Sequence, residues 1–384
     1  MRDVAIVGRG TTPFGVHDAG VKELATTAVT RALASSGLET EEIEALYLGN
    51  FTSGMLEGQE ALAALVADAV GLDGVPATKT EGACASSGIA FNQARQLIAA
   101  GVYDVIVVAG VEKMTGVPTE QFTQALSAAA DATTEQPAGL TFPGFYGLFT
   151  DRYLTEYDAD RTDISRVAVK NRRNAADNPR ARFRDPITID DVMESEPIAD
   201  PLRLYDCCPA ADGATAVVLA ANDVAPSITQ DPIQVLASAH TTGRSGAYRY
   251  EDLTTFEATR SAAEQAYDQA DVTPSDVDVV ELHDCFSSAE VGDSEDLGFF
   301  PKGDGADAVV AGKTDVNGEV AINPSGGLLS KGHPVGATGL GQIYETCLQL
   351  DGEHENQVED ARIGLTHNLG GSGAVCTVSV LGRR

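Results

Sequence analysis

"NPSGGLLSKGHPVGATG", residues 323–339, is the stretch on which our interpretation of the fold depends most. Its five glycines predict a turn in which the backbone closely approaches another segment, and a run with helical spacing follows. Pro334 restricts the backbone of His333 within that turn. A restrained histidine in a glycine-rich loop is typical of a general base or an oxyanion donor, with a purely structural histidine as the alternative. Within this stretch Lys331 precedes Gly332 and no G-K-[ST] sequence occurs, so the stretch is not a phosphate-binding loop.

Strands and helices alternate on both sides of this loop. In the second half, the pattern predicts strands over 232–240, 277–282, 361–368 and 374–382, and helices over 255–270 and within 327–350. In the first half, it predicts strands over 3–8, 45–50, 103–110 and 213–221, and helices over 21–36, 60–70 and within 81–101. A similar order therefore appears twice without readable residue identity, which indicates a duplicated α/β fold of βα units around buried sheets.

The region from about 115 to 225 interrupts this rhythm. It is rich in proline and polar residues, and this composition predicts mixed helices and loops inserted before the strand at 213–221. We therefore expect one half made of residues 1–115 and 205–225, an inserted loop domain at 116–204, and a second half at 230–384.

Acidic residues dominate the charge of the chain. There are 57 acidic and 26 basic residues, which gives a net charge of -31, and the acids are scattered along the sequence. A dispersed acidic surface suits a cytoplasm of very high salt, where self-repulsion is screened over a few ångströms. The composition thus favours a halophilic source over an acidic mesophilic one, and it disfavours nucleic acid or an anionic membrane as a partner.

Membrane insertion and export are not indicated. No stretch approaches the ~20 consecutive apolar residues that a transmembrane helix needs. The opening "MRDVAIVGRGTTPFG" runs directly into a strand-like segment without a small-residue cleavage site. We therefore expect a cytoplasmic protein.

The six cysteines do not form a recognisable framework. No pair has C-x-x-C spacing, so neither a disulfide scaffold nor a zinc site is expected. Cys207 and Cys208 in "YDCCPAADG" are interpreted as small buried residues. Cys84 in "EGACASSG" differs, because it precedes a helical run and would meet the positive end of the helix dipole. That position should lower the Cys84 pKa and favour a nucleophile, although a small hydrophobe at a helix start explains it equally well.

"VVELHDCFSS", residues 279–288, places a histidine and a cysteine just after an apolar run. If strand geometry persists, His283 and Cys285 point to one face and Asp284 to the other. An imidazole and a thiol would then face one pocket. The alternative is that all three residues only cap the end of a strand.

A third glycine-rich segment is "GLTHNLGGSGAV", residues 364–375, in which His367 and Asn368 precede Gly370 and Gly371. Consecutive glycines expose backbone N–H groups of the kind that an oxyanion hole uses. Gly370 and Gly371 are therefore candidates for backbone donors.

Together, "EGACASSG", "HDCF" at 283–286, "NPSGGLLSKGHPVGATG" and "HNLGGSG" resemble the thiolase superfamily, in the branch of sterol-carrier-protein-type and archaeal thiolases. The resemblance covers nearly the whole chain. It implies a five-layered αβαβα fold of two similar halves, each with a mixed five-stranded sheet, plus an inserted loop domain. It also implies reversible Claisen condensation of two acetyl-CoA to acetoacetyl-CoA and CoA, with coenzyme A thioesters as substrates and no cofactor.

The resemblance also implies roles for individual residues. Cys84 matches the acylated nucleophile, His333 the base that activates it, and Cys285 the second acid/base, while His283 would hold the thioester oxygen. His367 stands where better-known thiolases carry their second cysteine. Cys84, His333 and His367 thus also resemble the Cys-His-His set of ketoacyl synthases, which condense decarboxylatively.

Three expectations about partners follow from the same resemblance. The family forms dimers, often paired into tetramers. Archaeal members of this branch often work with a small OB-fold, zinc-ribbon-type protein and a hydroxymethylglutaryl-CoA synthase. A non-catalytic scaffold or acyl-CoA-binding subunit is the alternative outside enzymology, and the presence of Cys84 and His333 weakens it.

Overall fold

The computed structural model describes residues 2–383, and its main sheet has ten strands in the order β10-β9-β11-β12-β8-β1-β7-β4-β2-β3. The strands are β1 Val4–Thr11, β2 Ala45–Gly49, β3 Ala77–Thr80, β4 Val105–Glu112, β5 Pro197–Ala199, β6 Leu202–Arg203, β7 Gly213–Ala221, β8 Ile233–Thr242, β9 Val279–Glu281, β10 Ala321–Ile322, β11 Ile363–Gly370 and β12 Val375–Gly382. The α-helices are α1 Val21–Ser36, α2 Ser53–Leu56, α3 Leu62–Val70, α4 Ser86–Ala99, α5 Thr119–Ser127, α6 Phe142–Tyr157, α7 Arg161–Asn174, α8 Ile189–Glu194, α9 Glu257–Ala270, α10 Ser287–Asp296, α11 Gly305–Val310, α12 Gly327–Lys331 and α13 Thr338–Asp351.

The sheet consists of two five-stranded blocks with the same topology. In the first block, β2 pairs in parallel with β3 and β4, and β7 joins β4 to β1 by antiparallel pairing. In the second block, β9 pairs in parallel with β10 and β11, and β12 joins β11 to β8 by antiparallel pairing. The duplication predicted from the alternating pattern is confirmed.

The blocks are continuous, which the sequence pattern did not indicate. Edge strands β1 and β8 pair antiparallel through Ala5 with Gln234 and Ile6 with Ile233. Pairing satisfies backbone groups that would otherwise remain free at two sheet edges. The two expected sheets are therefore joined along one short edge.

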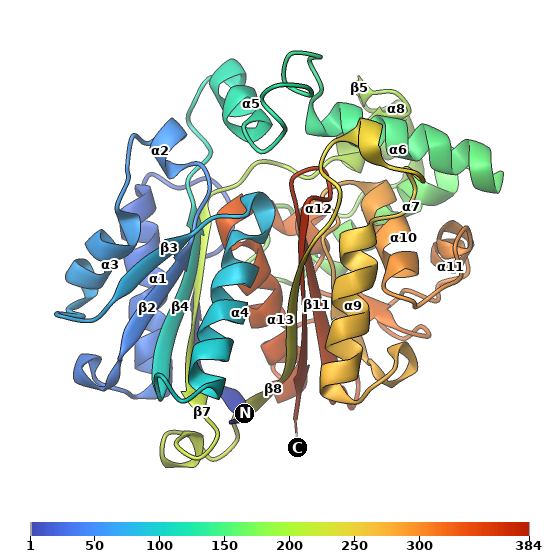
Figure 1. Ribbon diagram of the computed structural model, residues 1–384. Helices are drawn as coiled ribbons and strands as arrows, with labels where there is room; N and C mark the ends of the chain where they lie inside the picture. Colours follow the sequence, from blue (N-terminus) through green and yellow to red (C-terminus); the bar gives the residue numbers. More distant parts are fainter. Residues whose placement is uncertain (1, 384) are drawn as a thin grey trace.

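Helices form three layers around the two blocks (Figure 1). Helices α1 and α3 cover the outer face of the first block, and α9 covers the outer face of the second with α10 beside it. Helices α4 and α13 stand between the blocks, and each contacts strands of both. The resulting order of helix, sheet, helix, sheet, helix is the five-layered arrangement expected from the resemblance.

The two central helices touch at paired glycines. A Cβ atom on Gly339 would lie 2.8 Å from the backbone nitrogen of Gly88, closer than any side chain tolerates. Gly339 belongs to the loop stretch 323–339, for which we predicted a close backbone approach. This contact brings the N-terminal ends of α4 and α13 to the same place.

The region between β4 and β7 forms α5–α8 and the β5–β6 ribbon, with α5 and α6 across the top of the molecule in Figure 1. Helix α6 begins where the Thr141 hydroxyl accepts a hydrogen bond from the Gly144 amide, with proline in the first turn. The division into two halves and an inserted domain at the residues given above stays a prediction.

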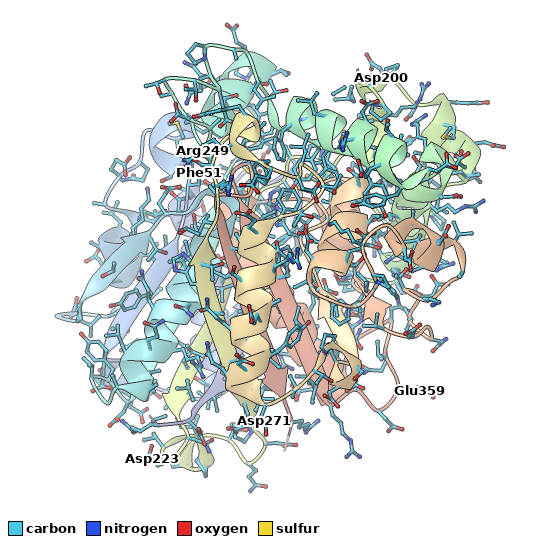
Figure 2. All side chains as sticks on the ribbon, turned by 45° about the vertical axis from the view of Figure 1, so that its right-hand side comes forward. Phe51, Asp200, Asp223, Arg249, Asp271 and Glu359 are labelled. Carbon is cyan, nitrogen blue, oxygen red and sulfur yellow. The ribbon has the colours of Figure 1, made fainter. Side chains whose placement is uncertain are left out.

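Exposed acidic residues are not confined to one part of the surface. Figure 2 shows Asp200, Asp223, Asp271 and Glu359, all exposed, on widely separated parts of the molecule. No helix within residues 2–383 is long and apolar enough to cross a membrane.

Candidate active site

The loops at the N-terminal ends of the central helices meet the β9–α10 loop at a cavity of about 320 Å³. Cys84, His283, Cys285, His333 and Gly371 all line it. Much of the remaining wall is apolar, and it includes the partly buried Phe51 at the end of β2 (Figure 2). A concave apolar site with a few convergent polar groups is the usual form of a small-molecule site.

Cys84 lies in a 3-10 turn, Ala83–Ala85, between β3 and α4. Ala83 has a positive φ of 50°, an unfavourable conformation for alanine, and its amide donates to the Glu81 carboxylate at 2.6 Å. This turn aims the Cys84 side chain into the cavity, where the backbone amides of Cys84 and Gly371 hydrogen-bond the thiol; the residue as a whole is partly exposed, but its thiol is buried.

The expected lowering of the Cys84 pKa is wrong. Burial raises the pKa of the Cys84 thiol to about 12, and the nearby Glu112 carboxylate adds to that rise. The hydrogen bonds from the two amides act in the opposite direction but do not compensate. Cys84 is therefore a thiol at neutral pH and needs a base.

His333 offers that base. Its Nδ1 lies 2.7 Å from the Thr338 hydroxyl, which itself donates to the Pro334 carbonyl. The hydroxyl must therefore accept from Nδ1–H, which leaves the lone pair of His333 on Nε2. This Nε2 is buried and has no hydrogen-bond partner among the described residues. Burial lowers the His333 pKa to about 3, so the ring is neutral.

His283 and Cys285 both line the cavity, as the alternation predicted. Asp284 points away, and its carboxylate accepts from the amides of Leu328 and Leu329 and from the Asn171 side chain. It thereby ties the β9–α10 loop to the start of α12. The reading of these residues as simple strand caps does not describe this arrangement.

The His283 ring is oriented by Asn368. The Asn368 amide lies 3.0 Å from His283 Nδ1, and donation by the amide leaves the His283 proton on Nε2. The rings of His283 and His333 meet edge to face, with centroids 4.9 Å apart. The Cys84 sulfur and one nitrogen from each ring lie within 4.8 Å of one another. A thiol, an acceptor nitrogen and a donor nitrogen thus converge.

Cys285 provides a second, more deeply buried thiol. Burial and the neighbouring Cys208 thiol raise the Cys285 pKa well above its ordinary value, while a hydrogen bond with the Tyr146 hydroxyl lowers it. The interpretation of Cys207 and Cys208 as buried residues needs correction, because both are partly exposed and line the cavity. Their segment pairs with the loops that carry Cys285 and His333, through bridges from Cys207 to Phe286 and from Ala210 to His333.

The structure does not bring His367 to the cavity wall. On β11, alternation turns Asn368 toward His283 and His367 into the protein interior. His367 Nδ1 accepts from the His283 amide, and Nε2 contacts the Thr259 hydroxyl. Gly370 also lies behind the site, where a Cβ would meet the Gly82 carbonyl oxygen at 2.3 Å.

Glu112 was missed by the sequence reasoning. It ends the fully buried strand β4, and its carboxylate accepts from the side chain of Asn50, from Thr52 and from the Gly336 amide. Burial raises the Glu112 pKa. An acid at the end of an otherwise apolar strand was the available signal, since it requires buried partners.

These features define a class of protein. A cysteine under two backbone amides, a neutral imidazole with a free lone pair, and a second thiol beside a histidine donor are the groups that acyl transfer through a thioester requires. The family comparisons agree. A family model described as "Thiolase, N-terminal domain" matches residues 4–223, and one described as "Thiolase C-terminal domain-like" matches residues 238–383. The chain belongs to the thiolase family.

Individual relatives align with all or nearly all of the chain. The acetyl-CoA acetyltransferase of Methanothermobacter thermautotrophicus is 42% identical, and the alignment covers 100% of both proteins. Human sterol carrier protein 2 is 32% identical over 98% of this chain and 71% of its own length. The solved structure titled "Ltp2-ChsH2(DUF35) aldolase" superposes with a TM-score of 0.85 at 27% identity, covering 99% of this chain and 98% of that one.

Proposed function

We propose that this protein is an acetyl-CoA C-acetyltransferase that condenses two acetyl-CoA molecules to acetoacetyl-CoA and CoA, and catalyses the reverse thiolysis. The observation that carries the proposal is the convergence of Cys84, His283 and His333 within 4.8 Å, at the cavity that Cys285 also lines. The 42% identity to an archaeal acetyl-CoA acetyltransferase over the full length supports the same activity.

The first half-reaction uses Cys84 and His333. The free lone pair of His333 Nε2 accepts the Cys84 proton, and the thiolate attacks the thioester carbonyl of acetyl-CoA. The amides of Cys84 and Gly371, which hydrogen-bond the sulfur, are the donors nearest to the oxygen that becomes negative. The C–S bond to CoA breaks, His333 returns its proton to the leaving sulfur, and acetyl-Cys84 remains.

The second half-reaction assigns the proton transfer to Cys285. Burial keeps most Cys285 protonated, so the step proceeds from its thiolate fraction, which the hydrogen bond from the Tyr146 hydroxyl stabilises and which removes an α-proton from the second acetyl-CoA. His283 Nε2–H donates to the enolate oxygen, since its tautomer is fixed by Asn368. The enolate carbon attacks acetyl-Cys84, acetoacetyl-CoA forms, and the proton on Cys285 returns to the Cys84 sulfur.

His367 has a positioning role in this scheme, because it contacts the His283 backbone behind the cavity. The decarboxylating alternative relied on Cys84, His333 and His367 together, and His367 does not line the cavity. Cys285 at the cavity favours proton abstraction from acetyl-CoA over decarboxylation. The scheme needs no bound cofactor.

The setting of the enzyme is also part of the proposal. The net charge of -31 supports an archaeal, halophilic and cytoplasmic origin. One solved thiolase-fold structure is described as a complex with a DUF35 protein, which supports a small partner protein for this enzyme as well. A hydroxymethylglutaryl-CoA synthase is a further candidate partner. We propose a homodimer or a tetramer as the assembly.

Acetoacetyl-CoA thiolysis by the purified protein in multimolar KCl tests the proposal, with Cys84→Ala and Cys285→Ala as variants. We expect cleavage by the wild type and a loss of about 10⁴-fold or more in both variants. Only Cys285→Ala should still take an acetyl label from acetyl-CoA. Full activity in Cys285→Ala would move the proton transfer elsewhere, and an inert wild type would leave the scaffold alternative.

A further inference from the structure

The Cys84, His283 and His333 cluster has the composition of a metal site. Within residues 2–383, it is the only group of three or more histidine, cysteine or acidic side chains whose ligand atoms all lie within 4.8 Å of one another. We propose that these three side chains form a reversible inhibitory site for Zn²⁺. Zinc prefers sulfur and imidazole ligands, and sites with three protein ligands leave a fourth position for solvent or substrate.

His333 already presents a free ring nitrogen to the cavity. Its Nε2 carries a lone pair, lacks a partner among the described residues and lines the cavity, while the residue is only 7% exposed. Its other ring nitrogen is held by Thr338 at 2.7 Å. Metal-binding histidines usually show this arrangement, with the far nitrogen fixed by an outer partner.

His283 becomes a ligand after one local change. Its proton must move from Nε2 to Nδ1, and an acceptor must then face Nδ1. Asn368 holds such an acceptor, because its side-chain oxygen has no partner in the described part of the chain and its amide already lies 3.0 Å from Nδ1. Rotation of the amide would exchange donor for acceptor.

Cys84 completes the set. Tetrahedral zinc places its ligand atoms roughly 3.5 Å apart, as its bond lengths of about 2.0–2.3 Å require. The ligand atoms lie within 4.8 Å of one another, so side-chain rotations around the cavity must bring them closer for zinc to bind. Binding replaces the proton of the Cys84 thiol, which is released to solvent, by a sulfur–zinc bond.

The consequence for catalysis rests on the proposed function. Zinc would occupy the nucleophile, its base and the enolate donor together, so the bound enzyme cannot form acetyl-Cys84. Acyl-CoA and zinc would therefore compete. The spacing of the cysteines gave no indication of zinc, because the three ligands come from three distant segments of the chain.

Binding of Co²⁺, used alone as a spectroscopic probe, tests the site without any enzymatic assay. We expect one Co²⁺ per chain, with a cobalt–thiolate charge-transfer band and the d–d bands of tetrahedral cobalt, and displacement by Zn²⁺. Cys84→Ser, His283→Ala and His333→Ala should each weaken binding by more than about 100-fold. Thr338→Val, which keeps all three ligands, should weaken it by about 10- to 100-fold.

Two variants serve as controls. Cys285→Ser removes a cavity thiol outside the cluster, and His240→Gln removes an exposed imidazole, so both should retain cobalt binding within about threefold. If a ligand variant fails to fold, iodoacetamide-treated wild type replaces it, and alkylation of Cys84 should abolish the charge-transfer band. Unchanged binding in Cys84→Ser, or no thiolate band in the wild type, would overturn the proposal.

Inhibition is measured separately, as thiolysis with Zn²⁺ and its reversal by a chelator. We expect competition between Zn²⁺ and acetoacetyl-CoA. An inert protein that binds cobalt would refute the proposed function but not the metal site, and an active protein without the cobalt spectrum would refute the metal site alone.

Discussion

The two halves of the molecule each place a 3-10 turn at the start of a central helix, and the turns differ in what they carry. Ala83–Ala85 precedes α4, and Val335–Ala337 precedes α13. The first contains Cys84, whereas the equivalent position of the second is Gly336 and its reactive residue, His333, lies three positions earlier. The duplication therefore places two similar turns at the site, and the different residues that they carry are the proposed nucleophile, Cys84, and the proposed base, His333.

The turns are also held differently. A carboxylate anchors each one, but Glu81 is a neighbour of Ala83 in the chain, whereas Glu112 reaches Gly336 from the other half of the molecule. The cysteine turn is thus fixed locally and the histidine turn is fixed across the two sheets. Substitutions in the two turns and at their anchoring glutamates test this difference.

The largest effect should follow removal of the base. His333→Gln takes away the basic Nε2 nitrogen while Cys84 keeps a pKa of about 12, so the Cys84 thiol stays protonated. We expect formation of acetyl-enzyme to fall by about 10²- to 10⁴-fold. The rate of Cys84 alkylation by iodoacetamide should then rise about tenfold per pH unit up to the thiol pKa, because only the thiolate reacts. A pH-independent rate would contradict this assignment.

The second effect is on stability, and it distinguishes the Glu112 carboxylate from the Glu81 carboxylate as supports of the two turns. Glu112→Ala leaves the Gly336 amide and the Thr52 hydroxyl without this acceptor in a buried place, and Glu112 is 0% exposed. We expect a loss of about 3 kcal/mol or more in the free energy of unfolding, measured by denaturant titration in high salt. Glu81→Ala should cost under about 1 kcal/mol, since its carboxylate is close to solvent. Equal losses would mean that the turns are anchored alike.

The smallest effect should come from Tyr146→Phe. This substitution removes the hydrogen bond that lowers the Cys285 pKa and keeps the ring. The Cys285 pKa should rise further, so less thiolate exists at a given pH. Exchange of the acetyl-CoA α-protons with deuterated water should slow by about tenfold and shift to higher pH. Acetylation of Cys84 should be unchanged, which a shared structural defect would not allow.

Sequence reasoning succeeded where a local rule decides the outcome. Alternation along the backbone placed His283 and Cys285 on one face, and the glycines of 323–339 predicted a close approach that Gly339 makes. It failed where distant residues decide. The Cys84 pKa depends first on burial that only the assembled halves create, and then on Glu112 at the end of another strand.

The sequence also could not show whether His367 or Asn368 faces the cavity, because distant residues decide this as well. Alternation states that only one of two adjacent strand residues faces the cavity, but it does not state which one. Pairing of β11 with β12 and β9 settles the orientation, and those partners are set by the whole sheet. The join between β1 and β8 was likewise invisible, because it pairs only two residues on each strand.

The position of β7 has a consequence for synthesis on the ribosome. This strand lies between β1 and β4, yet it begins at Gly213, long after β4 ends at Glu112. At about 5–20 residues per second, the ribosome adds the intervening segment in roughly 5–20 s. The first block waits for that time with two unpaired strand edges, so stalled nascent chains should lose their protease sensitivity only once residue 221 has left the exit tunnel.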